Sequence, residues 1–328
     1  MVTISGGSYI NANWVRDAPG TIKFAPQPFI MAQAPTMETM GDFYSLLYQH
    51  RVSVIVCLTP LVECGRVKAN RYWPSNKGES VSVASYIMKL EDDESFCRGS
   101  IVRRTLRLSL RDNNRSADFG SLSASSDNEE PEDLVLTMLH YTAWSDQASP
   151  ACLDSFSELI RQVRSVADVD RSRPVVAHCS AGVGRAGTFV ASYNLILLSE
   201  LFADRLADSS SSQASSSSTT TTSISVLTSS ASDSAMAVVE LDSRASAQVS
   251  ESSRKVTVKE MVDWLRNQRY GAVQTVSQYK FIPKVVALFE EAASSSDSLS
   301  LSTSSDDSNE EEECWLRTCQ FGSGLRVR

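Results

Sequence analysis

An apolar strand, a glycine-rich loop and an apolar helix follow one another directly between residues 174 and 197. The run Pro174-Val175-Val176-Ala177 is typical of a short buried strand. The helix is indicated by apolar residues at helical spacing, namely Phe189, Val190, Tyr193 and Leu197. This order predicts an α/β fold in which the loop joins the end of a strand to the N-terminus of a helix.

The loop has the sequence His178-Cys179-Ser180-Ala181-Gly182-Val183-Gly184-Arg185-Ala186-Gly187-Thr188. The backbone N–H groups of residues 180–184 and the helix N-terminus are expected to point at one spot and to favour an anion there. The same field favours the thiolate of Cys179, which makes this residue the candidate nucleophile. Arg185 can fold back and hold a phosphate through two parallel hydrogen bonds. Thr188 can donate a hydrogen bond to the sulfur when it becomes a leaving group.

The alternative for Cys179 is a small, buried residue in a tight turn, and for an isolated cysteine that would be the commoner interpretation. The surrounding pattern of His178, Gly182, Arg185 and Thr188 favours the functional interpretation. A nucleotide-binding loop of the Walker type is excluded, because no Gly-Lys-Ser or Gly-Lys-Thr follows the glycines.

Charge and composition narrow the class of protein further. The chain has 328 residues and a formal net charge of −8, which argues against a nucleic-acid binder with its strongly basic face. The apolar runs are shorter than the roughly 20 residues of a membrane helix, and the first residues do not resemble a secretory signal. Seven cysteines without CxxC pairs predict free thiols in a reducing compartment. We therefore predict a cytoplasmic location, and a nuclear location is the alternative.

Three stretches are rich in Ser and acidic residues and poor in apolar ones. They cover residues 112 to about 132, about 205 to 254, and 293–328. Such segments bury too little surface to offset chain entropy, so we predict all three to be disordered. The rest suits one domain over residues 1–292 that the first two segments interrupt, since long surface insertions add little closure entropy.

Apolar periodicity predicts further elements around the central unit. They are a helix after Thr39, a strand at 52–58, and helices at 153–163, 259–269 and 277–289. Gly271 is placed to cap the fourth of these elements, and Pro283 fits best near the first turns of the last. The mixture of helices and strands, without an internal repeat, supports the α/β class.

The pattern His-Cys-x₅-Arg-x-Gly-Thr resembles the signature loop of the cysteine-dependent protein tyrosine phosphatases. Six further segments resemble the phosphotyrosine-specific, non-receptor branch of that family, in the same order: Tyr9-Ile10-Asn11-Ala12, Gln33-Ala34-Pro35, Gly41-Asp42-Phe43, Tyr72-Trp73-Pro74, His140-Tyr141-x-x-Trp144 and Gln274-Thr275-x-x-Gln278-Tyr279. The resemblance implies a twisted mixed central sheet flanked by helices on both faces. It also implies phosphotyrosine proteins as partners, and catalysis through a phosphocysteine without metal or cofactor, in a chain taken as monomeric by default.

The resemblance also implies roles for residues outside the loop. Trp144-Ser145-Asp146 matches the mobile loop of the family, whose Asp protonates the leaving tyrosine. Gln278 and Gln274 match the glutamines that position the hydrolytic water. The alternative for Asp146 is an exposed acidic residue in a turn. The alternative for the two glutamines is an ordinary polar side chain on the protein surface.

Three more residues have supporting roles by the same resemblance. Glu63 matches the residue that orients the signature arginine, and Lys68 matches the lysine that approaches the general acid. A solvated ion pair is the alternative for Lys68. His178 is expected to be a hydrogen-bonded structural residue with a small influence on the thiolate, and no metal role follows for it because no ligands cluster around it.

Two departures from the family pattern matter. Ser145 stands where the family has proline, so the loop should close less often and catalysis should be slower. The recognition motif Lys-Asn-Arg-Tyr does not precede Tyr9, so we expect either that the sequence lacks an N-terminal part of the natural protein or that part of the selectivity for phosphotyrosine is lost. Both departures leave a second hypothesis open, a phosphotyrosine-binding pseudophosphatase. A Ser-rich scaffold protein is a third, supported by the insertions alone.

Overall fold

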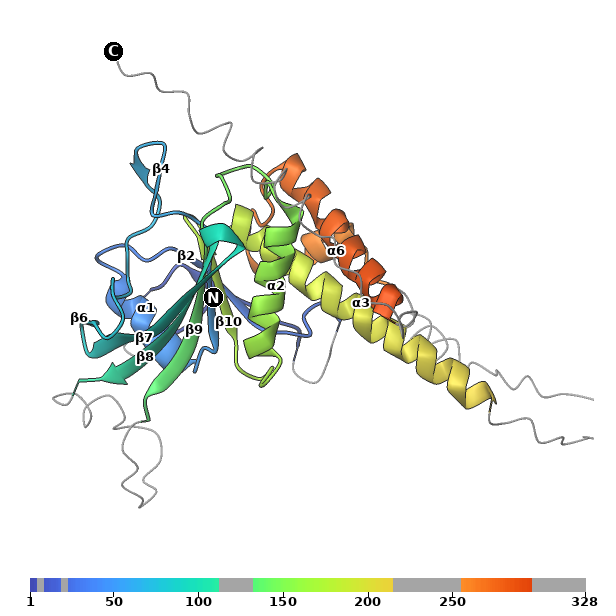
Figure 1. The fold of residues 1–328 in the computed structure, drawn as a ribbon, viewed down its shortest axis with the longest axis horizontal. Helices are drawn as coiled ribbons and strands as arrows, with labels where there is room; N and C mark the ends of the chain where they lie inside the picture. The colour runs from blue at the N-terminus through green and yellow to red at the C-terminus, as the bar shows by residue number, and fades with distance from the viewer. Residues whose placement is uncertain (5–8, 19–22, 112–131, 215–254, 297–328) are drawn as a thin grey trace, which may run out of the picture.

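The computed structural model describes residues 1–4, 9–18, 23–111, 132–214 and 255–296. Its centre is an eight-stranded sheet (Figure 1). In spatial order the strands are β1 (Ala12–Val15), β2 (Phe29–Gln33), β10 (Val175–Cys179), β3 (Val54–Cys57), β9 (Leu134–Tyr141), β8 (Ile101–Leu110), β7 (Tyr86–Phe96) and β6 (Ser80–Val83). A short 3₁₀ turn, η1 (Cys97–Gly99), joins β7 to β8, and a separate hairpin is formed by β4 (Val62–Glu63) and β5 (Arg66–Val67).

The sheet is mixed. The four strands β2, β10, β3 and β9 run parallel to one another, whereas β1 pairs antiparallel with β2, and β8, β7 and β6 continue the sheet antiparallel beyond β9. Parallel strands are buried on both faces and therefore consist of nearly continuous apolar residues. All four residues of β3 and all five of β10 are buried. The predicted mixed central sheet is confirmed.

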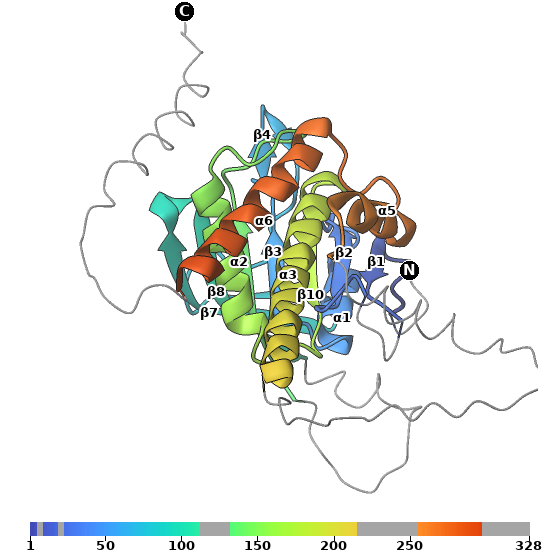
Figure 2. The same cartoon turned by 90° about the vertical axis from the view of Figure 1, so that its right-hand side faces the viewer.

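Helices cover both faces of this sheet. Figure 1 shows α1 (Met40–Gln49) on one side, and α2 (Leu153–Ala167), α3 (Gly184–Ala214) and α6 (Val276–Ser296) on the opposite side. Helix α5 (Val258–Gln268), labelled in Figure 2, contacts α3 and the edge strand β1. Successive side chains of a strand point to opposite faces, so each buried strand supplies both layers. Val56 packs in the layer under α2 and α3, while its neighbours Ile55 and Cys57 pack in the layer under α1.

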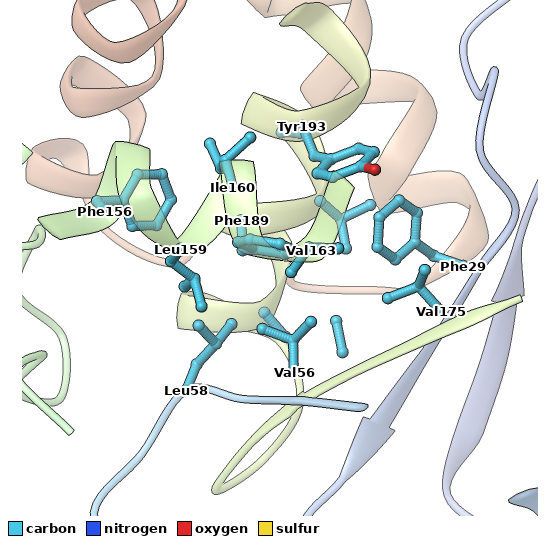
Figure 3. Close-up of a cluster of buried hydrophobic side chains, with 14 of the residues drawn as sticks. Phe29, Val56, Leu58, Phe156, Leu159, Ile160, Val163, Val175, Phe189 and Tyr193 are labelled. Atoms are coloured by element: carbon cyan, nitrogen blue, oxygen red, sulfur yellow. The ribbon is translucent and has the colours of Figure 1, made fainter. Parts of the chain in front are cut away.

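The layer beneath α2 and α3 is rich in aromatic rings (Figure 3). Phe189 lies 6.2 Å from Phe29 and 6.1 Å from Phe156, measured between ring centroids in edge-to-face contacts. Such contacts stabilise a core by about 0.5–1.5 kcal/mol each beyond their buried area. The first turns of α3 are thereby fixed against both the sheet and α2, and these turns carry the predicted loop.

Helix α3 is longer than the sequence analysis predicts. We expected disorder from about residue 205, but α3 continues to Ala214. Each residue added to an existing helix gains one hydrogen bond, and the Ala, Leu and Arg residues of this stretch favour helix. The helix α6 likewise continues to Ser296, past the expected domain boundary at 292. The rest of the three predicted disordered segments lies almost entirely outside the described residues.

One stretch of α3, Gly184–Arg205, has the length and apolarity of a helix that could cross a membrane. In the structure 67% of its most apolar window is buried inside the protein. Its partners there are β10, α5 and α6, as is usual for the central helix of a folded core.

Two local predictions need correction. Helix α5 ends with Arg269 as its C-cap, so Gly271 is not the cap but follows it, with φ of 77° in the next turn. Pro283 lies inside α6 instead of in its first turns, because the helix already begins at Val276. A proline at such a position removes one helical hydrogen bond.

Candidate active site

The candidate nucleophile lies where β10 ends and the loop to α3 begins. Cys179 is the last residue of β10 and is 4% exposed. The loop turns sharply at Gly182, which has φ of 70°. A Cβ atom there would lie 2.0 Å from the carbonyl oxygen of Ala32, so only glycine fits between the loop and β2.

The carbonyl groups of the loop are bonded to donors outside it. The N–H of Ala34 donates to the Ser180 carbonyl oxygen over 3.1 Å. Arg269, which is 5% exposed, donates from Nε to the Gly182 oxygen at 2.8 Å and from Nη2 to the Ala181 oxygen at 3.1 Å. Peptide N–H and C=O groups point in opposite directions, so fixing the carbonyls turns the N–H groups toward the other side of the loop.

Within the described residues, no acceptor binds the backbone N–H groups of residues 180–184. A row of unpaired amides at a helix N-terminus is a common anion site. The loop is therefore built as a cradle for an anion beside the thiol of Cys179.

Arg185 is buried beneath the cradle, with 1% of its side chain exposed. Its Nη1 donates to the carbonyl oxygen of Trp144 over 2.9 Å and lies 3.5 Å from Oε2 of Glu63. Its Nη2 lies 3.3 Å from Oδ1 of Asp146. Neither Nε nor Nη2 makes a hydrogen bond to a described residue. One edge of the guanidinium is thus fixed by the protein, while two donors remain for an anion.

Asp146 lies over the same site and is held from three sides. Its Oδ2 accepts a hydrogen bond from Lys68 Nζ at 2.7 Å, and its backbone N–H donates to Glu63 Oε1 at 2.7 Å. Partial burial raises the pKa of Asp146, but the Lys68 hydrogen bond and the charges of Arg185 and Lys68 outweigh it and lower the pKa overall. In this arrangement the side chain is a carboxylate.

Gln278 connects the last helix to the segment that carries Asp146. It is fully buried, its Oε1 accepts from the N–H of Gln274 at 2.9 Å, and its Nε2 donates to the Ala148 carbonyl oxygen at 3.3 Å. The same oxygen accepts from the indole Nε1 of Trp144 at 2.7 Å. The Gln274 side chain extends over Gly184, since a Cβ atom there would lie 2.5 Å from its Oε1.

The hydroxyl of Thr188 is bonded to the backbone in this structure, and its hydrogen bond to the sulfur as a leaving group stays a prediction. It is buried and donates to the Gly184 carbonyl oxygen at 2.9 Å, four residues earlier in α3. Threonine in a helix commonly bonds this carbonyl, and its single proton is then used. In this structure Thr188 holds the first turn of the helix that carries Arg185.

His178 is a buried structural residue, in line with its predicted role. Its Nε2 lies 2.7 Å from Tyr72 Oη, and its Nδ1 lies 3.3 Å from the Cys179 carbonyl oxygen. Burial lowers its pKa to about 4, and burial also lowers the pKa of His140 to about 4. Both imidazoles are therefore neutral near pH 7.

These two histidines predict a loss of stability in mild acid. Their folded-state pKa lies below the unfolded value near 6.5, so the unfolded chain binds more protons between these values. The contribution of each histidine to the free energy of unfolding is therefore fully present above pH 6.5. It falls as the pH drops toward 4, by roughly 3 kcal/mol for each histidine. Urea unfolding between pH 7 and 5 should show a falling midpoint, and His140→Gln should reduce the slope. A midpoint that stays constant over this range would contradict the assignment.

The remaining described cysteines, 57, 64, 97 and 152, are also free thiols. Burial raises the pKa of Cys57 to about 12, which makes it a poor nucleophile. Among the residues that the structure describes, no three His, Cys, Asp or Glu side chains lie together as a metal site would require.

The structure thus brings most of the predicted residues to one place: Cys179, the loop 180–184, Arg185, Asp146, Glu63, Lys68, Gln274 and Gln278. The sequence analysis missed Arg269, whose contacts with the loop carbonyls are described above. A basic residue at the end of an amphipathic helix normally indicates a solvated C-terminus. Nothing local in the sequence distinguishes the buried arginine from such a residue.

Comparison with known proteins agrees with this geometry. The protein-tyrosine phosphatase family model matches residues 2–201, and a model for a DSP-PTPase phosphatase domain of a Swiss Army Knife protein matches residues 133–282. Tyrosine-protein phosphatase 69D of Drosophila melanogaster is 33% identical over 188 residues, covering 57% of this chain and 12% of the relative. Tyrosine-protein phosphatase 3 of Dictyostelium discoideum is 28% identical over 286 residues, covering 85% of this chain and 22% of the relative. The chain thus spans less than a quarter of either relative.

Solved structures share the fold. TcPTP1 of Trypanosoma cruzi superimposes with a TM-score of 0.58 at 24% identity, over 88% of this chain and 76% of that one. PTPN18, solved in complex with HER2 phosphopeptides, gives a TM-score of 0.58 at 21% identity, over 86% of this chain and 77% of that one. Since one family model matches well over half of the chain, and its fold is that of these structures, the chain belongs to the protein-tyrosine phosphatase family.

Proposed function

We propose that the protein hydrolyses phosphotyrosine in proteins through a phosphocysteine intermediate. The observation that carries the proposal is the buried guanidinium of Arg185, whose Nε and Nη2 have no hydrogen-bond acceptor among the described residues. A buried guanidinium whose Nε has no acceptor, and whose Nη2 has only the Asp146 carboxylate 3.3 Å away, is costly unless a ligand completes its hydrogen bonds. A phosphate with two parallel oxygens would complete it next to Cys179.

In the first step, the thiolate of Cys179 attacks phosphorus while the bond from phosphorus to the tyrosyl oxygen breaks. Arg185 and the amides of residues 180–184 hold the three non-bridging oxygens, where negative charge is concentrated. The leaving phenolate takes a proton from Asp146. That residue must be protonated at this moment, and a bound phosphate dianion favours this because it offsets the positive charges of Arg185 and Lys68.

In the second step, water attacks phosphorus and the bond from phosphorus to sulfur breaks, which releases inorganic phosphate and restores the thiolate. Asp146, now a carboxylate, accepts the proton of the water. Gln274 extends over Gly184, and Gln278 bonds the segment that follows Asp146, which supports a role for these glutamines in orienting that water. The fixed positions of Glu63 and Lys68 keep Arg185 and Asp146 aligned through both steps.

The competing hypothesis is a phosphotyrosine-binding pseudophosphatase. It is favoured by Ser145 in place of the usual proline and by the carboxylate form of Asp146 in this arrangement. A comparison of wild type with Cys179→Ser separates the two. The enzyme releases phosphate from a phosphotyrosine peptide and from p-nitrophenyl phosphate, and Cys179→Ser abolishes both reactions. A wild type that binds the peptide and releases no phosphate would establish the pseudophosphatase instead. Cys57→Ser is the matched control, because that thiol lies in the layer under α1.

Lys68 should set the pH range of the first step. Its hydrogen bond and charge help to lower the pKa of Asp146, so Lys68→Met should raise that pKa and keep the acid protonated at higher pH. We expect the alkaline limb of the pH profile for single-turnover phosphorylation of Cys179 to move upward. Lys68→Arg keeps the charge and should leave the limb near its original place. If the alkaline limb lay at the same pH in Lys68→Met and Lys68→Arg, Lys68 would have no influence on the pKa of Asp146.

A further inference from the structure

Val273, in the turn between α5 and α6, has an unusual backbone conformation. Its φ is 59°, in the left-handed region, and among the described residues with positive φ only Val273 has a β-branched side chain. A branched side chain crowds its own backbone there, so the conformation is strained. Val273 is also buried, with 1% of its surface exposed. Strained residues of this kind persist only where the surrounding structure fixes them, and they gather at functional sites.

The guanidinium of Arg266 binds two carbonyl groups of this turn. Its Nε donates to the Ala272 oxygen at 3.0 Å, and its Nη2 donates to the Val273 oxygen at 2.9 Å. Arg266 itself is an exposed residue of α5. The two oxygens belong to the peptide groups before and after Val273, so the planar guanidinium fixes the orientation of both groups.

The N–H groups of the same two peptide groups are bonded to other elements. The Val273 N–H donates to the carbonyl oxygen of Val183, directly before α3, at 3.3 Å. The Gln274 N–H donates to Oε1 of Gln278, in α6, at 2.9 Å. Figure 2 shows α5 and α6 on either side of α3. All four polar atoms around Val273 therefore have partners, and these partners come from three different parts of the fold.

The first turn of α3 leaves room for the turn at Val273. A Cβ atom at Gly187 would lie 2.7 Å from the Val273 nitrogen, and a Cβ atom at Gly184 would lie 2.5 Å from Gln274 Oε1. Neither glycine has a positive φ, so both are needed for close approach and not for backbone conformation. The Gln274 amide thereby lies over Gly184, one residue before Arg185.

We propose that the strained backbone of Val273 positions the Gln274 amide for the second step of the reaction, in which water attacks the phosphocysteine. The inference rests on the proposed function. In an ordinary helical or extended conformation φ would differ by roughly 120° or more, which would direct Gln274 away from Gly184. Val273 is thus a positioning residue, and the two hydrogen bonds of Arg266 keep it in its conformation.

The turn should affect the two chemical steps unequally. Among the described residues, no hydrogen bond or ion pair joins residues 272–274 to Cys179, Arg185 or Asp146, which carry the first step. A displaced Gln274 would therefore slow hydrolysis of the phosphocysteine and leave its formation unchanged. When hydrolysis is the slower step, the phosphocysteine accumulates and the first equivalent of the phenol is released in a burst.

The test compares variants by stopped-flow kinetics with p-nitrophenyl phosphate. Arg266→Met removes both hydrogen bonds to the turn, and we expect hydrolysis of the phosphocysteine to slow by about tenfold or more. The rate of the burst, which reports the first step, should change by less than about twofold. Adding Val273→Gly should restore hydrolysis to within about threefold of wild type, because glycine adopts a positive φ without strain. Lys259→Met is the matched control, since Lys259 lies on the same helix and bonds Asp263 of that helix.

The double variant separates positioning from a merely structural role. Val273→Gly also removes a buried side chain, so it would only add to a structural defect. A double variant no faster than Arg266→Met, or equal losses in both steps, would overturn the inference. So would unchanged hydrolysis in Arg266→Met, or the same loss in Lys259→Met. A wild type that releases no phosphate refutes the proposed function and the inference with it, whereas a wild type that turns over without these effects refutes the inference alone.

Discussion

Asp146→Ala is expected to lower turnover of a phosphotyrosine peptide by about 10²- to 10⁴-fold, the usual contribution of a general acid. The loss should be at least an order of magnitude smaller for an aryl phosphate whose phenol is acidic, because such a leaving group needs little protonation. The contacts of Arg185 with Trp144 and Glu63 do not involve the Asp146 side chain, so the anion cradle should persist. The variant should therefore retain phosphotyrosine proteins long enough for them to be isolated with it. Steady-state kinetics on both substrates provides the measurement.

A matched control for this variant is Asp154→Ala, which removes an exposed acid from the first turn of α2. It should leave the ratio between the two substrates unchanged. Equal losses on both substrates in Asp146→Ala would mean that Asp146 only shapes its loop. The acid would then have to be sought elsewhere, with Glu63 the next carboxylate in contact with Arg185.

Arg185→Lys is expected to reduce kcat/KM by about 10³-fold or more, as removal of a phosphate-binding arginine does in other phosphoryl-transfer sites. Lysine keeps the charge, but it cannot present two parallel donors while also bonding the Trp144 carbonyl. Affinity for inorganic phosphate should fall as well, which isothermal calorimetry can measure.

Arg173→Lys is the control for a general effect of losing a guanidinium. Arg173 donates from Nε to the Arg51 carbonyl oxygen at 2.9 Å and takes part in none of the contacts of the candidate site. A change of less than tenfold in Arg185→Lys would show that the loop amides hold the phosphate almost alone. The proposed role of the guanidinium would then be wrong.

The sequence predicted the fold class well because the central elements carry strong local signals. The short apolar run of β10 and the glycines after it dictate a strand, a tight loop and a helix start, and the structure confirms them. The family resemblance is confirmed as well. The roles of Asp146 and Gln278 came only from resemblance, since a turn acid and a glutamine have no local signal. The structure places both side chains at the loop, and their chemistry stays a prediction.

Features that depend on long-range packing could not be predicted. The bonds of Arg269 to the loop carbonyls join residues 87 and 88 positions apart, and no periodicity reports such a contact. The place of Thr188 within a helix gives its hydroxyl a backbone acceptor, the carbonyl oxygen of Gly184, that the residue pattern of the loop does not indicate. The Ser-rich composition from about residue 205 did not predict where α3 ends. An established helix can continue through residues that would not start one.

The direction of the central strands separates the candidate site from the ends of the elements that adjoin the undescribed segments. The loop lies at the carboxyl end of β10, and α3 leads away from it for 31 residues, or about 45 Å. Strand β9 starts at Leu134, shortly after the undescribed segment 112–131, and Trp144 follows the other end of this strand. The ends of β9 and α3 that adjoin the undescribed segments 112–131 and 215–254 therefore lie away from the candidate nucleophile. A reporter domain joined at either of these ends should leave the positions of Cys179 and Trp144 unchanged.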